Sequence, residues 1–136
     1  MLFLLCLALW LPGILSLPAM DRDEARFAQA SKQMVETGNL VDIRFGTVPR
    51  YKKPIGIYWL QAASTAVFGH GALNAIWTYR VPSFLGGFAA VLLTFWLVRA
   101  IGPPSVAFAA ALLLALCLLL AVESIIATTD AVLLAT

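Results

Sequence analysis

The chain has 136 residues, of which 62% are hydrophobic and 12% are charged, with a formal net charge of +2 and a mean hydropathy of +0.92. This composition predicts a membrane protein whose few charges lie at an interface or in a protein-lined cavity, since a charge left in hydrocarbon is costly. The small net charge, with no long Lys/Arg run, excludes a nucleic-acid-binding protein, and no Cys/His spacing suits a metal site.

The first apolar segment, residues 1–18, carries no charge. Its length is close to the roughly 20 residues that a membrane-spanning helix needs. A cleaved signal peptide is the alternative, because the segment is short and ends near small residues. It lacks a basic amino-terminal region, and further hydrophobic segments follow. We therefore favour an uncleaved membrane helix.

A dense group of charges, Asp21 to Arg26, follows directly, and 12 of the 16 acidic and basic residues fall between Asp21 and Lys53. An amphipathic pattern over residues 25–36 predicts a helix, which Thr37-Gly38-Asn39 would end. Asp23 and Arg26 are three residues apart and therefore share a helix face. They form either a helix cap with a local ion pair or a charged group that meets a bound ligand.

A basic tetrad, Arg50-Tyr51-Lys52-Lys53, lies between two prolines, after residues 41–48, which alternate loosely as an extended segment would. Basic side chains at this depth suit a phosphate headgroup, although simple attraction to anionic lipid is the alternative. Residues 55–68 are apolar and rich in aromatic residues, which predicts a helix at the membrane surface.

Two further spans are predicted at residues 81–99 and 105–122, and the start of another at 128–136. An extracytoplasmic loop, residues 19–80, would connect the first two spans. The last segment stops without a helix-ending pattern, so we expect the chain to be the N-terminal part of a longer protein. The position of Pro82 favours the first turn of a helix. On a continuous helix, Glu123 and Asp130 would share a face and look into one cavity, and the alternative is that both are solvated in a short loop.

The order of these segments carries a resemblance to a known family. The chain has Asp-Arg-Asp-Glu-Ala-Arg-Phe-Ala (residues 21–28), Pro-Arg-Tyr-Lys-Lys-Pro (residues 49–54), Arg-Val-Pro-Ser (residues 80–83) and Thr-Thr-Asp (residues 128–130). It resembles the N-terminal part of GT-C-type, polyprenyl-phosphate-dependent glycosyltransferases, the superfamily of lipid A aminoarabinose transferases and protein O-mannosyltransferases. The resemblance implies an all-α membrane fold with amphipathic juxtamembrane helices in the first loop.

The resemblance also implies roles for individual residues. Asp23 would lie at the sugar-transfer centre, and Asp130 would contact substrate. Arg26 and Lys53 would bind the carrier phosphate, with Glu24 and Arg80 beside them in the same cavity. The donor would be a polyprenyl-phosphate sugar and the acceptor lipid A or protein, in the bacterial inner membrane, with the charged loop facing the periplasm.

One position departs from the family pattern. Aminoarabinose transferases commonly have an acid before the phosphate-binding lysine, where it helps to hold a divalent metal, and this chain has Lys52 there. The resemblance therefore leaves the cofactor unknown and places no metal ligand. The alternative function, from a different class, is a small non-enzymatic polytopic membrane protein whose charged loop binds anionic lipid or a partner.

Overall fold

The computed structural model describes residues 2–51 and 53–136, so Met1 and Lys52 lie outside the described residues. The described part contains helices α1 (Leu2–Ser16), α2 (Arg22–Thr37), α3 (Ile55–Phe68), α4 (Ile76–Ile101), α5 (Pro104–Ala115), α6 (Leu118–Ile125) and α7 (Asp130–Ala135). Two short antiparallel strands, β1 (Arg44–Phe45) and β2 (Val48–Pro49), form a hairpin between α2 and α3.

The fold is that of an all-α membrane protein, as predicted. Helix α4 is long and apolar enough to cross a bilayer, with a mean hydropathy of 1.9 over its most apolar 18-residue window. Helices α5 and α6 pass the same test only as a pair, and they bend by 60° at the break between them. Large apolar side chains on the outside of α4 to α6 stay exposed, as expected of a lipid-facing surface; they include Leu93, Trp96, Leu97, Leu113, Leu118 and Leu119.

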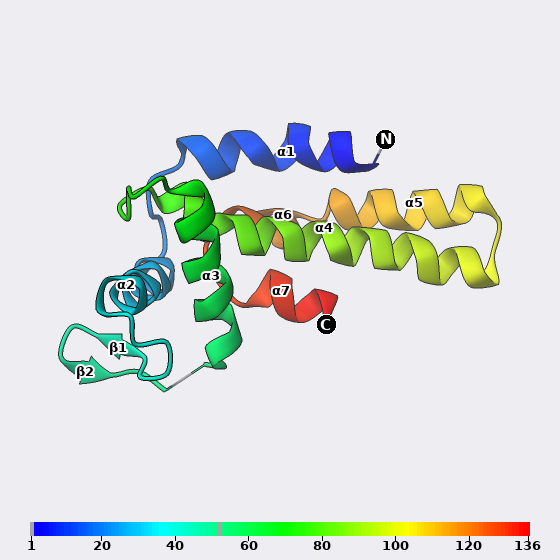
Figure 1. Ribbon diagram of the computed structural model, residues 1–136. Coiled ribbons are helices and arrows are strands. Elements are labelled where there is room, and N and C mark those ends of the chain that lie inside the picture. The colour runs from blue at the N-terminus through cyan, green and yellow to red at the C-terminus, as the bar shows by residue number, and fades with distance from the viewer. Residues whose placement is uncertain (1, 52) are drawn as a thin grey trace.

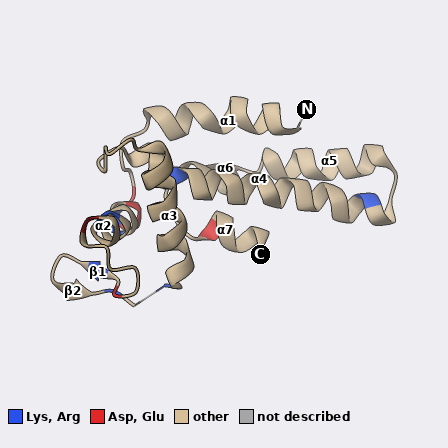
Figure 2. Cartoon of the chain, viewed as in Figure 1, with Lys and Arg blue, Asp and Glu red and all other residues tan. Residues whose placement is uncertain are grey.

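Helix α4 is the centre of the arrangement and contacts α1, α3, α5, α6 and α7. Helices α1 and α5 run alongside it, while α2, α3 and the hairpin lie at one end (Figure 1). Charged residues gather at that end around α2 and the hairpin (Figure 2). The fold therefore separates an apolar helical layer from a charged end.

The predicted position of Pro82 in the first turn of a helix is wrong, because α4 begins at Ile76 and Pro82 lies inside it. A proline within a helix removes the N–H that would bond to the carbonyl four residues earlier. Here that carbonyl belongs to Thr78, and the Ser64 hydroxyl of α3 donates a hydrogen bond to it at 2.6 Å. A neighbouring helix thus satisfies the carbonyl that Pro82 leaves free.

The predicted third span is also interrupted. Helix α5 ends at Ala115 and α6 ends at Ile125, after which a short loop precedes α7. Glu123 and Asp130 are therefore not on one continuous helix, so the first of the two readings does not hold. The Glu123 carboxylate instead accepts a hydrogen bond from the Thr128 hydroxyl at 2.7 Å.

Close packing of α4 against α7 depends on Gly86. A Cβ added there would lie 2.7 Å from the Cα of Val132, whereas at Gly87 the nearest atom is the Ser124 hydroxyl oxygen, which can rotate away. We expect Gly86→Ala to lower stability by about 1–3 kcal/mol through overpacking, and Gly87→Ala to lower it less. Both changes raise helix propensity equally. The difference in Tm between the two variants, measured by circular dichroism in detergent micelles, therefore reports the effect of packing alone. Equal Tm values would contradict the prediction.

Candidate functional site

The position of the charged residues follows from the amphipathic pattern of α2. Its buried face contains Phe27, Ala30 and Met34, which pack against Ile43 and Tyr58. The helix ends at Gly38, whose φ of 68° is a left-handed conformation that glycine adopts readily. The first turn therefore presents Asp23 and Arg26 on the outside while its inner face enters the protein.

Asp23 forms the centre of a surface cluster of three charges. Its Oδ1 accepts a hydrogen bond from Nη1 of Arg26 at 3.1 Å, and Nη2 of Arg50 lies 3.8 Å from the same oxygen. The Asp23 side chain is 58% exposed. Arg26 thus orients a carboxylate that lies near a second guanidinium group and remains open to solvent.

Arg50 reaches this cluster because its backbone and side chain are both held. Its N–H donates to the carbonyl of Ile43 at 2.8 Å, and its guanidinium lies 5.5 Å from the ring centre of Phe27, within the range of a cation–π interaction. A cavity of about 280 Å³ adjoins it, lined by Arg26, Phe45, Val48, Pro49 and Arg50. Two arginines therefore share one cavity on the charged end of the molecule.

Hydrogen bonds connect Asp42 to Tyr51 and to Arg44 of β1. The Tyr51 hydroxyl donates to Oδ1 of Asp42, and Nε of Arg44 donates to its Oδ2 at 2.6 Å. The bond from Tyr51, followed by that from Arg44, holds the pKa of Asp42 below its ordinary value, and the same bond raises the pKa of Tyr51. Because the pKa of Asp42 is lowered on folding, the Asp42 carboxylate stabilises the folded state at neutral pH. This stabilisation is lost as the pH falls through the lowered pKa.

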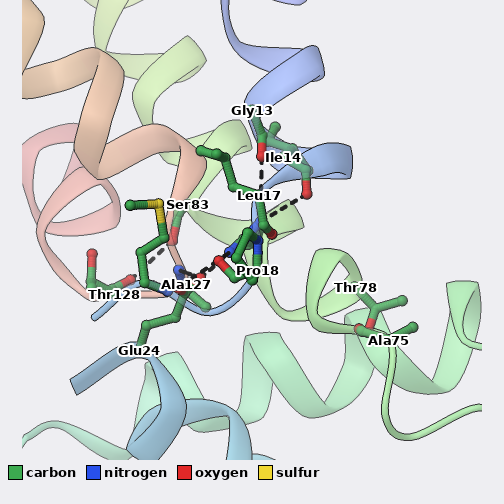
Figure 3. A network of polar contacts seen from close by, with 12 residues as sticks. Gly13, Ile14, Leu17, Pro18, Glu24, Ala75, Thr78, Ser83, Ala127 and Thr128 are labelled. Atoms are coloured by element: carbon green, nitrogen blue, oxygen red, sulfur yellow. Dashed lines mark hydrogen bonds and ion pairs between the residues drawn. The ribbon is translucent and has the colours of Figure 1, made fainter. Parts of the chain in front are cut away.

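Glu24 and Arg80 form a completely buried ion pair, with 2.7 Å between Nε of Arg80 and Oε1 of Glu24. Figure 3 shows the network around this pair. The remaining guanidinium donors bond to backbone carbonyls at the end of α1 and just after it, with Leu17 at 2.7 Å and Pro18 at 2.9 Å among them. Arg80 thus ties the end of α1 to α4, and neither side chain of the pair offers a free donor or an open face to a ligand.

The same network holds the loop before α7. Oε1 of Glu24 accepts a hydrogen bond from the N–H of Ala127 at 3.0 Å, and the Ser83 hydroxyl donates to the carbonyl of Thr128 at 3.0 Å (Figure 3). Nε2 of Gln61 donates to the carbonyl of Ala127 at 3.4 Å. Asp130, at the start of α7, is exposed. Because this loop directly precedes α7, these hydrogen bonds determine the position of Asp130.

The predicted site residues fall into separate groups. Asp23 and Arg26 come together, Glu24 and Arg80 come together inside the protein, and Asp130 follows the loop that Glu24 holds at Ala127. Lys53 is exposed directly before α3. Within residues 2–51 and 53–136, no hydrogen bond or ion pair joins Lys53 to the other predicted residues.

Sequence reasoning missed Gln61 as a structural residue. A polar side chain within the apolar run 55–68 was the available indication. Gln61 is completely buried and also accepts a hydrogen bond from the Ser31 hydroxyl at 2.7 Å.

Over the described ranges, no three His, Cys, Asp or Glu residues are arranged to hold a metal ion, and Lys52, where the family pattern has an acid, lies outside them.

Comparisons with known proteins point to one group. Residues 52–136 match the family model described as dolichyl-phosphate-mannose-protein mannosyltransferase. A Pseudomonas fluorescens protein named undecaprenyl phosphate-alpha-4-amino-4-deoxy-L-arabinose arabinosyl transferase 2 is 36% identical over 77% of this chain and 16% of its own length. A transferase of the same name, without the number, from Pseudomonas aeruginosa is 32% identical over 90% of this chain and 20% of its own length.

The chain thus spans at most about a fifth of the length of these curated relatives. No solved structure matches it.

Proposed function

Because the chain belongs to the dolichyl-phosphate-mannose-protein mannosyltransferase family, we propose that it forms part of a glycosyltransferase site that moves a sugar from a polyprenyl-phosphate carrier to an extracytoplasmic acceptor. The observation that carries this proposal is the exposed Asp23 carboxylate beside two guanidinium groups at the charged end of a membrane protein. Sugar transfer from a phosphate carrier to a hydroxyl would use a carboxylate as the base and cations at the leaving phosphate.

In the proposed reaction, an acceptor oxygen attacks the anomeric carbon and the bond from that carbon to the phosphate oxygen breaks. The electron pair of that bond leaves with the polyprenyl phosphate, whose charge Arg26 and Lys53 would stabilise. A hydroxyl acceptor must lose a proton, which the Asp23 carboxylate would take. A phosphate acceptor carries its charge already and would need orientation only.

The neighbouring elements support this assignment of roles. Lys53 precedes Pro54, the N-cap residue of α3, where no side chain caps the helix. The free N–H groups of a helix start favour an anion. Asp130 would contact substrate from the start of α7. Glu24 and Arg80 would act as positioning residues, because their burial leaves them no contact with a ligand in this arrangement.

The relatives' names mention undecaprenyl phosphate and 4-amino-4-deoxy-L-arabinose. We propose a polyprenyl-phosphate sugar as donor and lipid A or protein as acceptor, in the bacterial inner membrane. In this proposal the protein crosses the membrane several times and the loop of residues 19–80 faces the periplasm. The excess of Lys and Arg in that loop runs against the positive-inside rule, but the rule weakens for loops of about 60 residues.

The proposal is tested by expressing the longest reading frame that contains this chain and measuring transfer of radiolabelled sugar from an undecaprenyl-phosphate donor to lipid A and to membrane proteins. We expect transfer to one of these acceptors, and none from residues 1–136 alone.

Lys53→Ala should reduce transfer about 100-fold or more, as loss of one stabilising contact to developing charge does. Arg99→Ala, which removes the same charge at the far end of α4, should not change it. Lack of transfer to either acceptor would favour the non-enzymatic alternative.

A further inference from the structure

Two arginines of this chain are largely removed from solvent, and their surroundings differ. Arg80 is completely buried, and Glu24 and four backbone carbonyls receive its hydrogen bonds. The Arg50 side chain is only 13% exposed, yet its guanidinium donates no hydrogen bond to any residue in the described ranges, and its buried Nε has no partner. The hydrogen-bond donors of Arg80 all have acceptors within the protein, whereas the buried Nε of Arg50 has none.

An unpartnered guanidinium in this position is unfavourable for folding. A buried donor without an acceptor loses its bonds to water and receives nothing in exchange. The contact with Asp23 does not compensate, because 3.8 Å exceeds the 2.7–2.9 Å of a charge-assisted hydrogen bond. The fold nevertheless holds Arg50 in place through Ile43 and Phe27, which is the arrangement of a side chain whose acceptor comes from outside.

The cavity beside Arg50 indicates what that acceptor is. Arg26 and Arg50 both line it, and the other lining residues, Phe45, Val48 and Pro49, carry no charge. With one carboxylate, Asp23, between two guanidinium groups, the cluster has a net charge of +1. A guanidinium offers a planar fork of N–H donors that matches phosphate oxygens in pairs.

We propose that Arg50 binds a phosphate ester anion in the cavity that it shares with Arg26. The inference rests on the proposed function, in which that anion is the phosphate of the polyprenyl carrier. Arg50 would hold the phosphate with its free donors while Phe27 keeps the guanidinium plane in position. It would supply a cation to the leaving group in addition to Arg26 and Lys53.

The experiment measures binding of farnesyl phosphate to residues 1–136 in phosphatidylcholine nanodiscs by isothermal titration calorimetry. Arg50→Met keeps the contact with Phe27 but removes the donors, and we expect it to weaken binding about tenfold or more. Its Tm without ligand should be unchanged or higher, since the buried Nε that has no partner is removed. Arg22→Met, which removes the same charge from an exposed position on α2, should leave binding nearly unchanged.

Other arms identify the source of the phosphate. Farnesol, which lacks the anion, should not bind, and phosphatidylglycerol added to the nanodiscs should not displace farnesyl phosphate. Equal binding by the wild type and Arg50→Met, an equal loss in Arg22→Met, displacement by phosphatidylglycerol, or a lower Tm for Arg50→Met without ligand would each overturn the proposal. Arg50-dependent binding without sugar transfer by the longer reading frame would contradict the proposed function alone.

Discussion

Arg80→Met is expected to leave little folded protein. The substitution leaves the buried Glu24 carboxylate without its ion-pair partner. It also removes the guanidinium that donates hydrogen bonds to four backbone carbonyls at and after the end of α1. Breaking a buried pair from one side costs about 3–5 kcal/mol, a large part of the roughly 5–15 kcal/mol that stabilises a typical domain. Size-exclusion chromatography and thermal unfolding by circular dichroism in detergent micelles measure the loss.

Two further variants separate this network from a general effect of charge. Arg99→Met removes an exposed arginine from the same helix and should change stability by less than about 0.5 kcal/mol. Glu24→Leu combined with Arg80→Met should recover part of the stability, because no unpaired charge remains. Recovery stays incomplete, since the N–H of Ala127 also loses its acceptor. A normally folded Arg80→Met protein that has lost phosphate binding would instead support the role first predicted for Arg80.

Asp23→Asn is expected to reduce sugar transfer to a hydroxyl acceptor by about 10²–10⁴-fold, the usual contribution of a general base. The amide retains an oxygen that can accept from Arg26 but cannot take a proton. Because Asp23 is exposed, we expect the variant to fold, with a Tm within a few degrees of the wild type. Initial rates of labelled sugar transfer by the longest reading frame measure the effect.

Asp21→Asn is the matched control, two residues away and exposed, with no side-chain hydrogen bond at the start of α2. It should transfer sugar at nearly the wild-type rate. Wild-type transfer by Asp23→Asn would remove the base role. Loss of folded protein in that variant would show that the ion pair with Arg26 serves the structure, the alternative that the sequence left open.

Local features of the chain were predictable because neighbouring residues determine them. The apolar run predicted α3 at the residues where it lies, and Gly38 ends α2 as expected, because glycine adopts a left-handed backbone readily. The extended segment before the basic tetrad became the short hairpin. The break between α5 and α6 was not predictable, since the run from 106 to 122 is uniformly apolar and has no internal proline.

The sequence by itself determined that charge is concentrated in one loop of a membrane protein and that Asp23 and Arg26 share a helix face. It did not determine which of two adjacent carboxylates faces solvent. Glu24 is buried because Arg80, 56 residues away, and Ala127, 103 residues away, meet it there, while Asp23 stays exposed. Only the tertiary structure distinguished the saturated Arg80 from the unpartnered Arg50, because the solvation of a side chain depends on residues distant in the chain.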